Sequence, residues 1–372
     1  MTALTEGGAR KPLAFFDAEE VDRPTPDRNW RAIALGALAA TAALTIVWEI
    51  FWRGKGMTAG DFKNTEALWA EARREATGDA TVIIGSSRIF FGIDLDVWEE
   101  ASGVRPVQLA LEGTSPRIFL KDLAEDPEFN GQVIVGVTVP LFFGTDGGLR
   151  AAAIKYRRDE TPSQRLDHVL SKQLEGIFAF IDEQTRPKRQ VAIWPAPLRE
   201  GMKPRFSPRK LESLKADRNT ELWARVATDE RYLAEAKQQW LFGTKNNAPP
   251  PGPDGKPPAM PDAAIDAVIA EVGANIKKIR ARGGDVAFMR LPYDGAFAAL
   301  EDAEFPRARF WDRLVKETDS VGIAWQDHAA LQGHYIVEWS HLEASAAEDY
   351  TRAVAPIFYE AMKKNAAETA AR

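Results

Sequence analysis

Two short segments near opposite ends of the chain hold the residue types of serine catalysis. Gly85-Ser86-Ser87-Arg88 follows a short apolar run, and Glu338-Trp339-Ser340-His341 stands near the C-terminus. A serine hydroxyl becomes a nucleophile when a histidine accepts its proton and a carboxylate orients that histidine. Because Glu338 precedes His341 by three residues, one loop can supply both groups. The two segments predict acyl-transfer chemistry by a triad of Ser87, His341 and Glu338.

Small polar residues also follow the next two apolar runs. They form the segments Glu112-Gly113-Thr114-Ser115-Pro116 and Gly136-Val137-Thr138. Backbone N–H groups at such turns can bind the oxyanion of a tetrahedral intermediate. We therefore expect an oxyanion hole made by the N–H groups of Ser87 and Gly113 and assisted by the Thr138 hydroxyl. Three side chains are weaker candidates for binding substrate: Arg88, Thr114 and Ser115.

Each part of this site also has a plainer interpretation. Glycine and serine favour turns and helix caps whether or not they do chemistry, and Ser86 is better suited to support the turn than to attack. Arg88 is at least as well suited to an ion pair with a neighbouring helix. Asp327 is the alternative acid if Glu338 points away from His341.

The other histidines are weaker candidates. His168 falls in a polar helical segment and is predicted to be structural, whereas His328 and His334 are predicted to be surface residues near the site. The four histidines lack the spacing of a metal site. The chain has no cysteine, which excludes thiol catalysis, thiolate ligands and disulfides. No cofactor is expected, because no glycine-rich nucleotide-binding loop follows a predicted strand.

The elements that must position these residues alternate along the chain. Short apolar, β-branched runs predict strands over residues 81–85, 107–111, 132–139, 191–194, 285–289 and 322–325. Helical spacing fits residues 118–124, 164–184, 263–282, 305–318 and 343–364 between and after them. The alternation predicts an α/β fold, with a mainly parallel sheet between two layers of helices as in flavodoxin. Binding sites in such sheets form at the carboxyl ends of the strands, where Ser87, Gly113 and Thr138 stand.

An apolar segment near the N-terminus predicts one transmembrane helix over residues 30–52. Residues 32–48 contain no charged side chain, and the stretch to Trp52 would reach about 30 Å, the thickness of a hydrocarbon core. Trp30 on one side, and Trp48 and Trp52 on the other, suit the aromatic belts at the two interfaces. A core helix would show a polar face, and a signal peptide would follow a short basic region, but this segment has neither feature.

Charge sets the expected orientation and the remaining domain boundaries. Five Lys or Arg residues precede the apolar segment and three follow it closely, which keeps the N-terminus in the cytoplasm and exports the rest across the inner or plasma membrane. Residues 1–29 are predicted to be a disordered cytoplasmic tail, and residues 53–79 a linker helix. Residues 80–365 would form the α/β domain, with a helical and Pro-rich insertion at about 200–262. The net charge of −6 disfavours nucleic acid as a partner.

Together these motifs resemble the SGNH, or GDSL-like, hydrolase superfamily over roughly residues 80–360. Gly85-Ser86-Ser87 matches the nucleophile block, Gly113 matches the glycine of the second block, and Glu338-Trp-Ser-His341 occupies the last block. The Gly-Ser-Ser form is most similar to the membrane-anchored branch, which includes alginate O-acetylation proteins and the D-alanyl transfer protein of teichoic acid synthesis. The resemblance implies an exported serine esterase or O-acyltransferase acting on an envelope polysaccharide, with a multi-span membrane O-acyltransferase as partner.

Two departures from the family pattern define the competing interpretation. The third block normally carries an asparagine that donates to the oxyanion, and the nearest residue here is Thr138. The acid is glutamate, one methylene longer than the family's aspartate. Both changes are compatible with a non-catalytic SGNH-like subunit that binds or assembles a polysaccharide modification or export complex. The retained Ser87 and His341 favour the enzyme.

Overall fold

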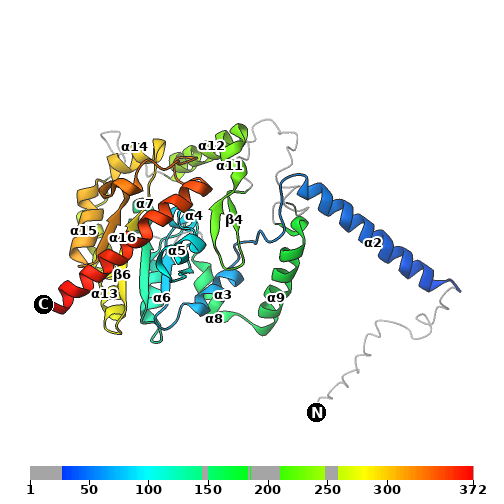
Figure 1. The fold of residues 1–372 in the computed structure, drawn as a ribbon, viewed down its shortest axis with the longest axis horizontal. Coiled ribbons are helices and arrows are strands. Elements are labelled where there is room, and N and C mark those ends of the chain that lie inside the picture. The colour runs from blue at the N-terminus through cyan, green and yellow to red at the C-terminus, as the bar shows by residue number, and fades with distance from the viewer. Residues whose placement is uncertain (1–26, 145–149, 183–184, 186–209, 248–258, 372) are drawn as a thin grey trace, which may run out of the picture. The chain divides into compact units, whose positions relative to one another are not determined.

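The computed structural model describes residues 27–144, 150–182, 185, 210–247 and 259–371 (Figure 1). The chain divides into two units, which join between Phe51 and Trp52. The predicted tail over 1–29 lies almost wholly outside the described residues, as do the predicted strand at 191–194 and part of the predicted insertion.

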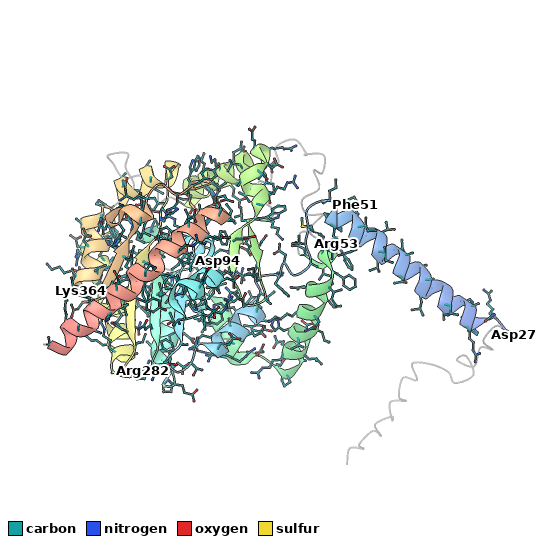
Figure 2. All side chains as sticks on the ribbon, viewed as in Figure 1. Asp27, Phe51, Arg53, Asp94, Arg282 and Lys364 are labelled. Atoms are coloured by element: carbon teal, nitrogen blue, oxygen red, sulfur yellow. The ribbon has the colours of Figure 1, made fainter. Side chains whose placement is uncertain are left out.

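The described part of the first unit contains the helix α2 (Trp30–Arg53) as far as Phe51, and the last two residues of α2 belong to the second unit. The helix has 24 residues and is long and apolar enough to cross a membrane. Most of its apolar side chains are exposed, whereas those of the second unit fill the spaces between elements (Figure 2). The predicted apolar helix is confirmed.

The second unit is built on a five-stranded, fully parallel sheet. The strand order is β2-β1-β3-β6-β7, which corresponds to the doubly wound order 2-1-3-4-5. The strands are β1 (Thr81–Ile84), β2 (Val107–Gln108), β3 (Gln132–Gly136), β6 (Asp285–Arg290) and β7 (Val321–Ala324). The strand order reverses between β1 and β3, so a crevice is expected at their carboxyl ends.

Helices cover both faces of this sheet because alternate strand residues point to opposite sides. Ile83 belongs to one core with α4 (Ser87–Gly92), α5 (Leu95–Ser102) and α16 (Ala344–Ala371), which crosses this face in red in Figure 1. Val82 and Ile84 belong to the opposite core. That core contains residues of α3 (Glu66–Glu75), α6 (Arg117–Glu125), α7 (Val139–Phe143), α13 (Asp262–Arg280) and α15 (Trp311–Glu317). The α/β fold with a parallel sheet between helical layers is thereby confirmed.

A β-hairpin protects the outer edge of β2. The hairpin consists of β4 (Glu212–Leu214) and β5 (Thr220–Leu222). From its turn the buried Arg218 donates to the carbonyl oxygens of Gln108 and Ala110, each at 2.8 Å. Carbonyls that would stay unpaired at a sheet edge are thus satisfied by a side chain.

The hairpin lies within the insertion that was predicted at about 200–262 to be helical and Pro-rich. Among its described residues, helix begins at α11 (Ala224–Thr228) and continues as α12 (Glu230–Asn247), after the two strands of the hairpin. Two further boundaries differ. The predicted linker helix over 53–79 is helical as α3 only from Glu66 to Glu75. The predicted helix over 305–318 begins at Trp311 and is preceded by α14 (Gly295–Glu304), because Pro306 disfavours helical backbone at Phe305.

Two further helices, α8 (Ala152–Asp159) and α9 (Pro162–Ile177), follow α7 along the chain. Thr161 caps α9 with a full capping box, in which its side chain bonds the backbone N–H of Gln164 and Gln164 returns the bond.

Candidate active site

Ser87 is the first residue of α4 and follows β1 after a turn of two residues. The turn is tight because a Cβ at Gly85 or at Gly136 would overlap Ile89 of α4. Two glycines therefore let the helix pack directly against the ends of β1 and β3. The Ser87 side chain is half-buried, whereas Ser86 is 1% exposed.

Ser86 has a structural partner at the end of the neighbouring strand. Its hydroxyl lies 2.5 Å from the hydroxyl of Thr138, which is the residue before α7. The pair links the end of β1 to the end of β3 and occupies one hydrogen bond of each hydroxyl. This supports the interpretation that Ser86 stabilises the turn, and it gives Thr138 a partner other than substrate.

Glu338 and His341 form a buried pair. Their exposed fractions are 0% and 2%, and a Glu338 carboxylate oxygen accepts a hydrogen bond from His341 Nδ1. With the proton held at Nδ1, the other ring nitrogen, Nε2, has a free lone pair and can act as a base. In the described structure Nε2 is buried and has no hydrogen-bond partner, and the same holds for Glu338 Oε2.

The loop that carries this pair contains a backbone conformation that residues other than glycine rarely adopt. Trp339 has a φ of 75°, in the left-handed region. Ile336 and Leu342 pair across the base of the loop, and the backbone N–H of Asp294 donates to the Trp339 carbonyl at 2.9 Å. The indole packs on Gly295, where a Cβ would overlap it. Strained backbone of this kind persists only where its surroundings fix it, and it gathers at functional sites.

Two side chains of α4 contact the loop that carries Glu338 and His341. Phe91 lies four residues after Ser87 and so on the same face of the helix, and its ring centroid is 4.6 Å from that of His341. Arg88, the residue after Ser87 in α4, donates from Nε to the Ser340 hydroxyl at 3.2 Å. The structure thus packs α4, which begins at Ser87, against the loop that carries Glu338 and His341, and no hydrogen bond joins His341 Nε2 to Ser87.

Arg88 is buried beneath this site. Its guanidinium lies 2.6 Å from the Glu301 carboxylate on α14 and 4.6 Å from the ring centroid of Tyr293. Both charged side chains are at most 5% exposed, and burial raises the pKa of Tyr293. The ion pair foreseen as the plainer role of Arg88 is therefore present.

Gly113 lies at the carboxyl end of β2, beside the end of β1. The backbone N–H of Leu111 donates to the Gly85 carbonyl at 3.1 Å, and Gly113 adopts a φ of 61° two residues later. The preceding Glu112 carboxylate accepts a hydrogen bond from Asn64 Nδ2 at 2.7 Å and forms an ion pair with Arg150 at 2.5 Å. The backbone of the predicted oxyanion loop is thus fixed on its outer side.

The two remaining candidates for substrate binding are buried in this loop. The Thr114 hydroxyl donates to the Glu112 carbonyl and accepts from the Arg150 N–H, each at 3.1 Å. Ser115 is 2% exposed, and its hydroxyl has no partner among the described residues.

The alternative residues lie elsewhere. Asp327 accepts two hydrogen bonds of 2.6 Å from Arg307, which hold the pKa of its carboxyl below the usual range. His168 pairs with Glu71 of α3 at 2.9 Å, which fits its predicted structural role. His334 contacts the Ala330 carbonyl at 3.2 Å. Glu338 is therefore the carboxylate that orients His341.

Helix α12 adds residues to the site that the sequence did not indicate. The Trp240 ring lies 6.3 Å from that of His341, edge to face, and 6.5 Å from that of Phe297. Lys237, one turn earlier, places its ammonium 5.1 Å from the Trp339 ring centroid. A helical insertion was predicted at about 200–262, but no local pattern links it to a loop about one hundred residues later.

No protein-family model matches this chain, and no curated protein matches its sequence.

Proposed function

We propose that the chain is a membrane-anchored serine esterase or O-acyltransferase of the SGNH type, acting on an envelope polysaccharide or related polymer. The observation that carries the proposal is the buried Glu338–His341 pair next to α4, which begins at Ser87. Leaving a buried nitrogen without a partner costs about 1–3 kcal/mol in stability. A catalytic role would explain this cost, because His341 Nε2 would then bind a proton only during the reaction.

The geometry supports a two-step acyl transfer. His341 Nε2 would accept the Ser87 hydroxyl proton as Ser87 Oγ bonds to the acyl carbon, and Glu338 would stabilise the resulting imidazolium. The N–H groups of Ser87 and Gly113 would donate to the oxyanion. As the intermediate collapses, the ester C–O bond breaks and His341 returns its proton to the departing alcohol. Water or a sugar hydroxyl would then release the acyl group by the reverse sequence.

The position of these residues in the fold supports a binding site. Ser87, Gly113 and Thr138 all follow the carboxyl ends of β1, β2 and β3, where the strand order reverses. Doubly wound sheets bind their ligands in the crevice at this place.

The helix α2 supplies the anchor in this proposal. It would cross the inner or plasma membrane with the N-terminus inside, which keeps the α/β unit beside the membrane on the extracytoplasmic side. A multi-span O-acyltransferase in the same membrane would be a natural source of acyl groups.

A fluorophosphonate probe tests the chemistry. The full-length protein in detergent is expected to be labelled, to hydrolyse an aryl acetate, and to lose both activities on Ser87→Ala. Ser345→Ala is the matched control, because Ser345 is an exposed serine close to His341 in sequence. Labelling that survives Ser87→Ala would remove the esterase proposal.

One observation favours a second candidate, a non-catalytic binding or assembly subunit. The Thr138 hydroxyl, which stands where the family has an asparagine donor, is already bonded to Ser86. If wild-type protein takes up no probe while a polysaccharide still binds to it, this second function is the better account.

A further inference from the structure

Helix α9 (Pro162–Ile177) is amphipathic, but its apolar side faces away from the domain instead of towards the core. Its apolar residues form one stripe at helical spacing, and every one of them is exposed: Leu166 60%, Val169 54%, Leu170 56%, Leu174 46% and Ile177 58%. No residue of this helix is buried. A surface helix of a soluble domain normally turns such a stripe towards the core.

The polar side of α9 faces the domain instead. His168 and Lys172 both contact the Glu71 carboxylate of α3, at 2.9 and 2.8 Å. Glu175 accepts a hydrogen bond from the backbone N–H of Lys63 at 3.2 Å. Since these contacts fix the rotation of the helix about its axis, the outward direction of the apolar stripe is set by the fold.

The C-terminus of α9 lies next to the point where the chain leaves the apolar helix α2. Arg53, the last residue of α2, donates from its guanidinium to the Ile177 carbonyl at 3.3 Å. The Gly60 N–H donates to the Glu175 carbonyl at 2.9 Å. Trp48, five residues before Arg53, is exposed, and tryptophan is a residue type that anchors helix ends at the headgroup level. A membrane crossed by α2 would therefore have its surface within reach of α9.

We propose that α9 is an interfacial helix whose apolar stripe inserts into the headgroup–acyl boundary of the bilayer that α2 crosses. The proposal rests on the anchor in the proposed function and not on its chemistry. Sixteen residues of helix reach about 24 Å, and their charged side chains rule out a second span, so the helix would lie in the membrane plane.

The charges of α9 favour apolar insertion over electrostatic attraction. Two basic residues, Arg165 and Lys172, balance two acidic residues, Asp167 and Glu175. Lipid binding by such a helix depends on the buried apolar area and little on salt. Insertion would fix one side of the α/β unit to the membrane surface.

Single cysteines test this contact cleanly, because the chain has none of its own. Leu170→Cys in the full-length protein is labelled with bimane and reconstituted into phosphatidylcholine–phosphatidylglycerol vesicles that carry nitroxide lipids. Val104→Cys is the matched control, since Val104 is also an exposed apolar residue (39%) but belongs to the loop after α5. Ala39→Cys, within α2, reports insertion of the anchor.

We expect shallow nitroxides to quench the label at position 170 at least about threefold more than the label at 104, in low and high salt alike. Quenching at 170 should also fall to the level of the control when Leu166 and Leu174 are both changed to Asp. Equal quenching at 170 and 104, with the Ala39 label quenched by deep nitroxides, overturns the proposal. So does energy transfer between labels at 170 without lipid quenching, which would indicate a second copy of the chain on the stripe. An unquenched Ala39 label removes the anchor as well, whereas the Ser87 probe reaction in detergent is independent of all three outcomes.

Discussion

Replacement of Glu338 by glutamine isolates the orientation of His341 from every other part of the proposed mechanism. The side chain keeps its length, but the carboxylate that accepts from Nδ1 becomes an amide that can donate to Nδ1 instead. The imidazole then holds its proton on Nε2, where the lone pair is needed as a base. The substitution therefore leaves the residues in place and favours the wrong tautomer.

The substitution is expected to lower kcat strongly and to leave folding stability unchanged or slightly higher. Loss of the correct tautomer lowers kcat by about 10³–10⁴, which corresponds to about 4–5.5 kcal/mol of transition-state stabilisation. The KM should hardly change, because Glu338 is fully buried behind His341. Folding stability should stay the same or rise by about 1 kcal/mol, since a buried charge with one unpaired oxygen is removed.

The assay is hydrolysis of an aryl acetate by the full-length protein, with unfolding by urea followed in parallel. Glu343→Gln is the control, because the Glu343 carboxylate instead accepts from the N–H of Ser345 at 2.9 Å and caps α16. It is expected to cost about 0.5–1 kcal/mol of stability and to leave kcat unchanged. A Glu338→Gln protein that retains a tenth of wild-type kcat, or that loses activity only in step with stability, would refute the role given to Glu338.

Three further predictions concern the surroundings of the site. Gly295→Ala should displace Trp339 and the loop it belongs to, and lower kcat by about tenfold or more, because the new Cβ overlaps the indole; kinetics and the fluorophosphonate labelling rate measure this. Arg218→Met should lower the free energy of unfolding by about 3 kcal/mol, as read from urea denaturation, because two buried carbonyls lose their donor. Glu212→Gln should flatten the pH dependence of the melting temperature. Burial and the neighbouring Glu112 carboxylate raise the pKa of Glu212 from 4.5 to about 8. The folded state therefore binds this proton more tightly than the unfolded state, and the stability of the wild type falls as pH rises from about 4.5 to about 8.

Matched variants separate these effects from general damage. Gly103 has a φ of 72° with open space around it, so Gly103→Ala reports the strain of the left-handed backbone without any overlap. It should lose about 1 kcal/mol of stability and no activity. An equal effect of both glycine substitutions on kcat would contradict the argument for Gly295. Arg218→Lys should recover part of the lost stability, and a melting temperature that still falls steeply between pH 5 and pH 8 in Glu212→Gln would show that another group titrates.

Local patterns predicted those parts of the fold that short segments determine. The β-branched runs gave the positions of the five strands in the sheet because parallel strands buried on both faces are continuously apolar. Glu338 and His341 are three residues apart, so their pairing is also a local property, and the structure contains it. The alternation of strands and helices was enough to predict the layers.

Long-range contacts determine the parts that the sequence did not reveal. The strands β4 and β5 have three residues each, and Arg218 in their turn is bonded to carbonyls about 110 residues earlier. A helical insertion was predicted there, because no local feature of the sequence shows that the edge of a sheet needs hydrogen-bond donors. Trp240 likewise reaches His341 only through the tertiary fold.

The features of the 338–341 loop are hard to explain as stabilising ones. Trp339 holds an unfavourable φ, Gly295 is needed to make room for it, and two buried polar atoms of Glu338 and His341 have no partner among the residues that the structure describes. Each of these features costs free energy, and replacing the pair with apolar residues would remove much of that cost. A loop selected only for stability would not retain all of them, whereas a loop that must present a correctly protonated imidazole towards the start of α4 would. The expected loss of kcat without loss of stability in Glu338→Gln follows from this difference, and it separates a catalytic loop from a merely structural one.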